Sequence, residues 1–204
     1  MISIPSFRFQ NGFEERRFVM NNKKLLMLVE IAIFAGIGLV LDQISFKLWP
    51  QGGSISFVML PILIMAVRWG KLSGMATGLI IGLLQMIFFP YIVHWLQGIL
   101  DYLVAFTVVG LAGIFRRQIL QAANEVNKKS IAIYVTLGII VGGLLRYAAH
   151  ALAGAVFFSE YAGDQNVWIY TIIYNGTYMI PAIILTAIVG SIIFTAAPRL
   201  LKTK

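Results

Sequence analysis

The chain has 204 residues, of which 59% are hydrophobic and 12% charged, so it carries more apolar surface than a soluble domain of this length can hide. Lys and Arg outnumber Asp and Glu by 16 to 8, but they lie between apolar runs and form no continuous basic face, which argues against nucleic-acid binding. The chain has no cysteine, which excludes disulfides, thiolate metal sites and cysteine nucleophiles.

The N-terminal segment, residues 1–22, lacks the apolar core and small-residue cleavage site of a signal peptide, so we predict a cytoplasmic extension. Residues 23–204 hold six apolar stretches, most of them near the roughly 20 residues that a membrane-spanning helix needs. The predicted stretches are 25–46, 55–67, 72–89, 96–115, 131–158 and 167–197. The sequence therefore predicts an all-α integral membrane protein, a bundle of six transmembrane helices.

The cations predict the orientation of the bundle, because loops rich in Lys and Arg stay in the cytoplasm. Fourteen of the sixteen fall in alternate connections: the N-terminal segment up to Lys24, the turn at Arg68 and Lys71, the loop 116–129, and the C-terminal end. The other connections, including the one with Glu160 and Asp164, carry almost none. Both termini are therefore expected in the cytoplasm.

Polar residues inside apolar stretches are the candidate functional residues, because each costs several kcal/mol in lipid unless it is paired or faces a cavity. Asp101 lies early in the fourth stretch, beside Tyr102. Its carboxylate is expected either to face a ligand or to pair with an internal partner such as Arg146. In the fifth stretch Arg146, His150 and Gly154 recur at four-residue spacing and share one helix face.

The sixth stretch begins with Tyr170, Tyr174 and Asn175, and interfacial anchoring explains the aromatic rings but not the amide. The outer ends of the last three stretches thus offer a carboxylate, an imidazole, an amide and several rings. Aromatic faces and a carboxylate attract a cation, and an amide fixes orientation. The sequence predicts a site for a flat, polar, cationic molecule, with no metal-ligand cluster and no catalytic triad.

Small residues in the first stretch suggest a helix contact, because Ala32, Ala35, Gly36 and Gly38 allow another helix to approach closely. Packing within the same bundle is the alternative explanation. No nucleotide-binding motif is present, so an ATP-driven step would require a partner protein.

Five segments together resemble the thiamine-binding S-components of energy-coupling factor (ECF) transporters, over nearly all of the chain from Lys23 onward. They are Glu30-Ile-Ala-Ile-Phe-Ala35, Ser54-Ile-Ser-Phe-Val-Met-Leu-Pro61, Gln97-Gly-Ile-Leu-Asp-Tyr102, Leu145-Arg-Tyr-Ala-Ala-His-Ala-Leu-Ala-Gly154, and Tyr170 with Tyr174-Asn175-Gly176. The resemblance implies a multi-pass protein of the bacterial plasma membrane that binds thiamine near the outer face.

The resemblance also implies which residues bind the vitamin. The pocket residues would be Tyr91, Asp101, Tyr102, His150, Gly154, Phe158, Tyr170 and Asn175, and Trp49 would be an aromatic residue of a lid loop. Two positions depart from the family pattern, which has glutamate where Asp101 stands and tryptophan where Phe158 stands. A shorter acid and a smaller ring are expected to change affinity more than ligand identity.

The partners implied are a transmembrane coupling subunit, which would dock on Ala32 and Gly36, and two cytoplasmic ATPases. The chain itself would bind substrate, use no cofactor and catalyse no reaction. Three alternatives remain open: an S-component for another vitamin or a thiamine precursor, an integral-membrane enzyme using His150 and Asp101 as acid and base, and a structural or assembly protein.

Overall fold

The apolar stretches fold into helices in the computed structural model, which describes the backbone of residues 7–47, 50 and 52–201 and, along the first helix, side chains from residue 22 onward. Among these described residues, five helices or helical runs are long and apolar enough to cross a membrane. They are α1 (Phe7–Gln43, apolar from Asn22), α3 (Lys71–Phe88), the run Trp95–Asn124, α7 (Lys128–Phe157) and α8 (Val167–Ala196). Within the described residues the only β pairing is a single bridge between Phe46 and Ile55.

The second predicted span is shorter than expected. It forms α2 (Met59–Arg68), whose 10 residues reach about 15 Å at 1.5 Å per residue, about half of the hydrocarbon core. Most of its side chains are buried, so α2 lies inside the bundle and contacts α1, α3 and α8. The first residues of the predicted stretch, from Ile55 to Val58, form a loop in place of the predicted helix.

The fourth predicted span is a helical run of changing pitch. It consists of α4 (Trp95–Gly98), a π-helical turn η1 (Ile99–Val104), α5 (Ala105–Val109), a 3-10 segment η2 (Gly110–Phe115) and α6 (Arg116–Asn124). The prediction of one regular helix over 96–115 was therefore incomplete. Single π turns inside α-helices are frequent at functional sites, and this one carries Asp101 and Tyr102.

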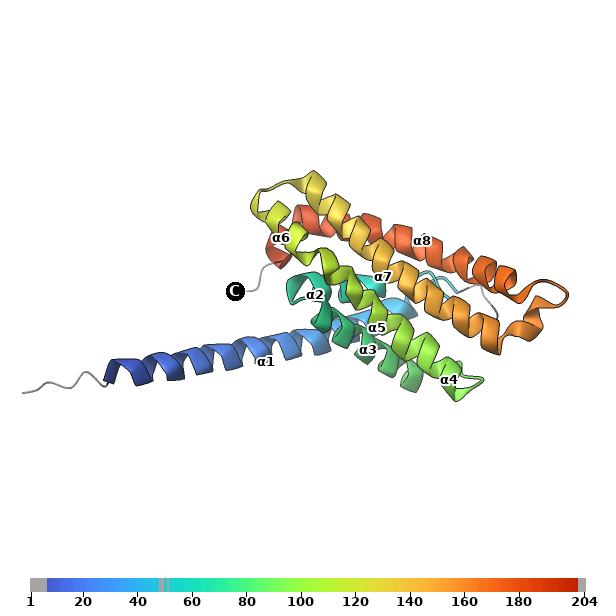
Figure 1. The fold of residues 1–204 in the computed structure, drawn as a ribbon, viewed down its shortest axis with the longest axis horizontal. Coiled ribbons are helices and arrows are strands. Elements are labelled where there is room, and N and C mark those ends of the chain that lie inside the picture. The colour runs from blue at the N-terminus through green and yellow to red at the C-terminus, as the bar shows by residue number, and fades with distance from the viewer. Residues whose placement is uncertain (1–6, 48–49, 51, 202–204) are drawn as a thin grey trace, which may run out of the picture.

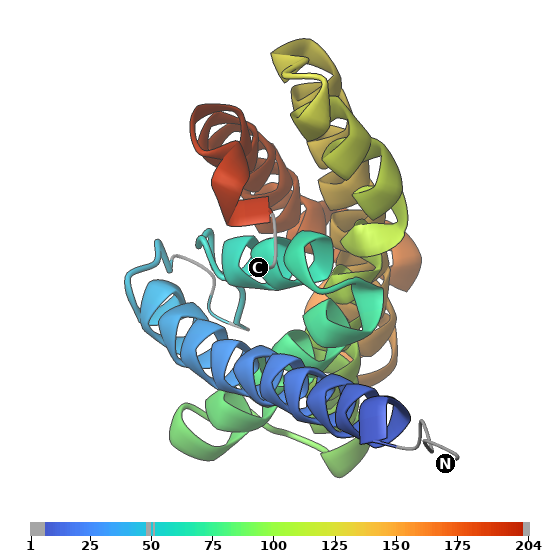
Figure 2. The same ribbon diagram turned by 90° about the vertical axis from the view of Figure 1, so that its left-hand side faces the viewer.

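The first helix passes through the expected boundary at residue 22 without a break, since α1 begins at Phe7. Its N-terminal part projects beyond the bundle (Figure 1). Its C-terminal part packs against α2 and α3, on the other side of the bundle from the paired helices α7 and α8 (Figure 2).

Glycines allow the close packing between α3 and the fourth helical run. A Cβ at Gly78 would collide with the carbonyl oxygen of Phe106, and a Cβ at Gly82 with that of Tyr102. Backbone-to-backbone contact at these two points holds the π-helical turn against α3.

The surface is apolar where a lipid-facing surface is expected. Along α8, Ile173, Ile180 and Ile188 are more than half exposed, whereas Asn175 and Thr186 are buried. A helix that exposes its aliphatic side chains and buries its polar ones is suited to lipid and not to water. This arrangement agrees with a multi-pass membrane protein.

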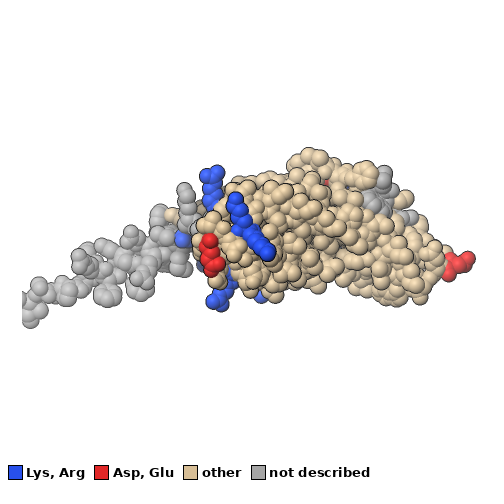
Figure 3. Space-filling model, turned by 90° about the horizontal axis from the view of Figure 1, so that it is seen from above, with Lys and Arg blue, Asp and Glu red and all other residues tan. Residues whose placement is uncertain are grey.

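The charges lie at the two ends of the bundle (Figure 3). Described cations gather at the end nearest the projecting part of α1, where Arg68 also forms a bidentate ion pair with Glu30, at 2.5 Å and 2.8 Å, and ties α1 to α2. Trp69 Nε1 donates to the same carboxylate at 2.6 Å. This asymmetry agrees with the predicted orientation, with the cation-rich end in the cytoplasm.

Candidate functional site

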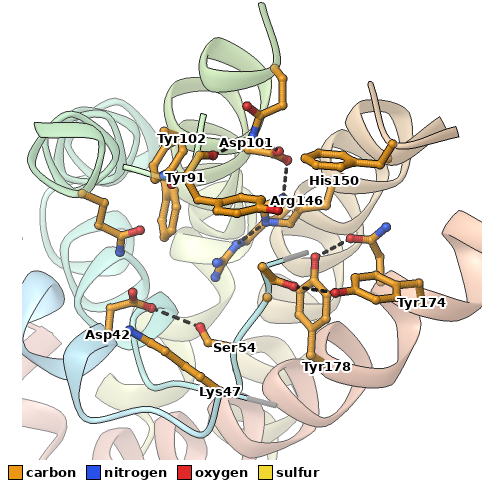
Figure 4. A pocket seen from close by; sticks show the side chains of 18 of the residues that line it. Asp42, Lys47, Ser54, Tyr91, Asp101, Tyr102, Arg146, His150, Tyr174 and Tyr178 are labelled. Carbon is orange, nitrogen blue, oxygen red and sulfur yellow. Dashed lines mark hydrogen bonds and ion pairs between the residues drawn. The ribbon is translucent and has the colours of Figure 1, made fainter. Parts of the chain in front are cut away.

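A cavity of about 270 Å³ lies between α1, α3, the π-helical turn, α7 and α8 (Figure 4). Its volume is near the lower end of the roughly 300–1,000 Å³ typical of small-molecule sites. The lining residues are Asp42, Gln43, Lys47, Gly52, Gly53, Ser54, Gln85, Phe89, Tyr91, Gln97, Asp101, Tyr102, Phe106, Arg146, His150, Gly154, Phe158, Tyr170, Thr171, Tyr174, Asn175 and Tyr178. We call it the central cavity.

Asp101 is held on both sides by hydrogen bonds. Its Oδ1 lies 2.7 Å from His150 Nδ1, and its Oδ2 accepts from Gln97 Nε2, also at 2.7 Å. His150 Nε2 in turn accepts from Arg146 Nε at 3.3 Å, and the Arg146 guanidinium lies over the Phe106 ring, 4.2 Å from its centroid. The internal partner of Asp101 is therefore His150, which links it to Arg146.

The hydrogen-bond chain determines the tautomer of His150. A guanidinium can only donate, so His150 Nε2 must be the acceptor and carry no proton. The proton of a neutral ring is then on Nδ1 and points to Asp101. Both ring nitrogens are thus engaged within the protein, and Asp101 keeps lone pairs that face the cavity.

The hydroxyl group of Tyr102, a lining residue, is hydrogen-bonded within the protein. Its hydroxyl accepts from the backbone N–H of Tyr91 at 2.8 Å and lies 3.4 Å from the carbonyl oxygen of Phe89, to which it donates. It therefore holds the segment between α3 and α4 against the π-helical turn. The Tyr91 ring stacks on Phe158, with 6.2 Å between centroids and 9° between planes, and the two rings form an aromatic wall of the cavity.

Gly154 allows α7 and α8 to meet at the cavity. A Cβ there would overlap Thr171 Oγ1 and come within 3.2 Å of Asn175 Nδ2. Asn175 Nδ2 donates to the carbonyl oxygen of Thr171 at 2.8 Å and to its Oγ1 at 3.0 Å, while Tyr178 donates to Asn175 Oδ1. The amide of Asn175 is thereby oriented before any ligand arrives.

The loop after α1 closes one side of the cavity. Ser54 Oγ and Ser56 Oγ donate to Asp42 Oδ1 at 3.4 Å and 3.0 Å, and Tyr174 donates to the carbonyl oxygen of Gly52 at 3.0 Å. Gly53 has a φ of 109°, and a Cβ there would meet the Tyr178 ring at 2.5 Å. The loop is thus fixed to α1 and α8 at separate points.

The structure brings eight of the nine predicted pocket residues to the central cavity: Tyr91, Asp101, Tyr102, His150, Gly154, Phe158, Tyr170 and Asn175. Trp49 lies outside the described residues. The sequence analysis missed several polar lining residues: Asp42, Gln43, Lys47, Ser54, Gln85, Thr171 and Tyr178. Asp42 and Gln85 interrupt the apolar stretches 25–46 and 72–89, which is the signal that identified Asp101, whereas Ser54 and Tyr178 carry no comparable signal.

The small residues of α1 separate into two faces. Ala35 is buried, and a Cβ at Gly38 would collide with Ile81. Ala32 is exposed, and a Cβ at Gly36 would have no atom within 4 Å. Packing within the bundle thus accounts for one pair, and the other pair faces outward.

Comparison with known proteins gives consistent matches along the chain. The model of the thiamine transporter protein family (Thia_YuaJ) matches residues 28–202. The thiamine transporter ThiT of Bacillus subtilis (strain 168) is 44% identical over 186 residues, 89% of this chain and 97% of that protein. ThiT of Lacticaseibacillus paracasei is 31% identical over 91% of this chain and 95% of that protein.

A solved structure of ThiT from Listeria monocytogenes is similar to this fold, with a TM-score of 0.84 and 30% identity. The match covers 89% of this chain and 100% of that one. The likeness therefore extends over most of the fold.

Proposed function

The chain belongs to the thiamine transporter protein family, and on that premise we propose that its central cavity binds thiamine as the substrate-binding subunit of an ECF-type importer. The observation that supports this most directly is the carboxylate of Asp101, held by His150 and Gln97 at one side of a cavity with aromatic walls. The protein is a multi-pass component of the bacterial plasma membrane.

The chemistry of the cavity matches that of thiamine, which joins an aminopyrimidine to a cationic thiazolium ring. A carboxylate with fixed lone pairs can accept from the exocyclic amine, and aromatic faces attract the cation. The Tyr91 and Phe158 rings supply such a face, and Tyr170 lines the cavity from α8. Hydrogen-bonded side chains around the site avoid much of the entropy cost of ordering it on binding.

The direct contacts are expected from only some of the predicted residues. His150, Tyr102 and Asn175 each use polar atoms on internal partners, so we assign them to positioning Asp101, the 89–91 segment and the α7–α8 contact. The carboxylate of Asp101 and the rings of Tyr91, Phe158 and Tyr170 are then the groups that meet the ligand.

Transport requires partners, and we infer that the outward face of Ala32 and Gly36 docks a transmembrane coupling subunit that works with two ATPases. The open space beside Gly36 supports this inference, because a second helix can approach the α1 backbone there. Its relatives are named transporters, which supports a role in transport over a role in catalysis.

The alternative substrate is a thiamine precursor that keeps the pyrimidine half, since Asp101 can accept from an aminopyrimidine in either molecule. Calorimetric competition between thiamine and the hydroxymethylpyrimidine fragment separates the two. We expect thiamine to bind more tightly by at least about tenfold, because only thiamine carries the cation. Equal or tighter binding of the fragment would favour the precursor, and turnover of either compound would favour an enzyme.

A further inference from the structure

The chain between α3 and α4 exposes apolar side chains where a loop in water would carry polar ones. Within residues 88–96, which we call the aromatic connection, Phe88 is 60% exposed and Trp95 is 66% exposed. The sequence has no Lys, Arg, Asp or Glu between Lys71 and Asp101, so no such charge interrupts this surface. A contiguous exposed apolar surface marks contact with another molecule or with lipid. The other large hydrophobic residues that it exposes are Phe89, Tyr91, Ile92, Val93 and Leu96.

The length of α3 places the aromatic connection at the edge of the bilayer. The helix begins at Lys71, directly after the turn that carries Arg68, and its 18 residues reach about 27 Å at 1.5 Å per residue. The hydrocarbon core is about 30 Å thick. A helix that starts at the inner boundary of the core therefore ends just short of the outer boundary. The residues that follow Phe88 leave the helix before it has reached water.

The surface of the aromatic connection continues the lipid-facing surface of α3. Leu79, Leu83 and Ile87 are exposed and recur at four-residue spacing, so they form one stripe along the helix. The stripe ends next to Phe88, where the aromatic connection begins. The aromatic connection is thus exposed to the same surroundings as the outer half of α3.

The connection between α7 and α8 has the opposite character. Its residues Glu160, Asp164 and Asn166 are exposed and polar, and acidic side chains lie at the outermost tip of this end of the molecule (Figure 3). α7 and α8 have 30 residues each and reach about 45 Å, enough to carry their connection beyond the hydrocarbon core. One outer connection is therefore built for water, and the aromatic connection is not.

The aromatic connection also carries part of the cavity wall. Tyr91 stacks on Phe158, and its carbonyl oxygen accepts from Gln97 Nε2 at 3.3 Å. A second stack lies beside the first, because the His94 ring lies against Phe157, with 4.9 Å between centroids and 19° between planes. The position of this segment therefore determines where the Tyr91 ring stands.

We propose that the aromatic connection is a lipid-binding surface, which lies in the outer interface of the bilayer and thereby holds the aromatic wall of the central cavity in place. Tryptophan and tyrosine favour this interface, because their rings are apolar and each carries one polar group. Trp95 and Phe88 are the anchors. The lipid contact does not depend on the proposed function, whereas its effect on binding rests on it.

The depth of the aromatic connection can be measured with spin labels, because the chain has no cysteine and a single introduced one is labelled alone. Phe88→Cys and Val93→Cys each receive a nitroxide in the purified full-length chain, in phosphatidylcholine vesicles. Power saturation compares access of oxygen, which partitions into lipid, with access of a nickel chelate, which stays in water. We expect the oxygen-to-nickel ratio at both sites to exceed that at the control Asp164→Cys by at least about threefold.

The hold on the cavity wall is tested by amide hydrogen exchange at Tyr91 in the same vesicles, which requires no ligand. Trp95→Gln removes the ring, whereas Trp95→Tyr replaces it by another ring that favours the interface. We expect exchange at least about fivefold faster in Trp95→Gln and within about twofold of the unmodified chain in Trp95→Tyr. Thermal unfolding checks that both variants remain folded.

The outcomes separate lipid from other occupants of the surface. Nickel access at Phe88→Cys and Val93→Cys equal to that at Asp164→Cys would overturn the lipid contact. Spin–spin broadening between labels would show that a second copy of the chain covers the surface, and would overturn it as well. Equal exchange at Tyr91 in Trp95→Gln and the unmodified chain, or equally fast exchange in both variants, would refute the hold on the wall. A chain that failed to bind thiamine would refute the proposed function and leave these measurements unaffected.

Discussion

Replacement of Asp101 by asparagine tests the role of its carboxylate in ligand binding. The carboxylate accepts from His150 Nδ1 and Gln97 Nε2, each at 2.7 Å. An amide supplies one acceptor oxygen and one NH₂ group, so it can satisfy only one of these donors. Gln97 cannot easily turn over to compensate, because its Oε1 accepts from the N–H of Val93 and its Nε2 also donates to the carbonyl oxygen of Tyr91.

The magnitude follows from the interactions that are lost. A hydrogen bond to a charged group is worth about 1.5–3 kcal/mol and a neutral one about 0.5–1.5 kcal/mol, so the ligand should lose about 1–3 kcal/mol. This corresponds to a dissociation constant raised roughly 5- to 150-fold. The bundle should still fold, because His150 keeps its bond from Arg146 and the glycine contacts of the π-helical turn are unchanged.

The assay is calorimetric titration of thiamine into purified Asp101→Asn, with size-exclusion chromatography and thermal unfolding as measures of fold. Asp164→Asn, the same change of charge at an exposed residue of an outer loop, provides the matched control. A folded Asp101→Asn variant with unaltered affinity would refute the role of Asp101 in binding. A variant that fails to insert or fold would instead assign Asp101 to structure, as part of the chain through His150 to Arg146.

Three further substitutions test the α7–α8 contact, the outward face of α1 and the segment between α3 and α4. Gly154→Ala forces a methyl group onto Thr171 Oγ1, so thermal unfolding should reveal a loss of about 1–3 kcal/mol; unchanged stability would contradict the tight α7–α8 contact. Gly36→Leu enters open space, so thiamine binding should stay within twofold while uptake by cells is abolished; normal uptake would remove the docking assignment. Tyr102→Phe removes the acceptor of the Tyr91 N–H, so hydrogen exchange of that amide should accelerate, and unaltered exchange would mean that the bond does not hold the segment.

The sequence predicted the helices whose boundaries depend on local signals. For α3, α7 and α8 the predicted ends agree with the observed ones to within about three residues, because charged residues and loops interrupt hydrophobicity there. It did not predict that α2 spans only Met59–Arg68. A short helix enclosed by its neighbours, together with the loop before it, is as apolar in composition as a full membrane-spanning helix. The π turn at Ile99–Val104 was not predicted from the sequence either, because it packs against Gly82, which is distant in the chain.

The sequence predicted which residues line the cavity better than it predicted what each of them does. Polar residues in apolar stretches and the family resemblance together indicated residues that the structure gathers around one cavity. The direction of the hydrogen bond at His150, and therefore its neutral ring, follows from the position of the Arg146 guanidinium. The four-residue spacing predicted that the two residues share a helix face, but it could not predict which nitrogen atoms meet. Asp42 carries the same signal, a carboxylate inside an apolar stretch, but the small residues of that stretch indicated only a helix contact.

Thiamine binding by the chain alone is the central claim, and titration of the purified, ATP-free protein with thiamine by isothermal calorimetry tests it most directly. We expect saturable binding of one thiamine per chain, weakened in Asp101→Asn and unaffected in Asp164→Asn. Absence of a binding isotherm from correctly folded protein would contradict it and would assign the central cavity to a different ligand.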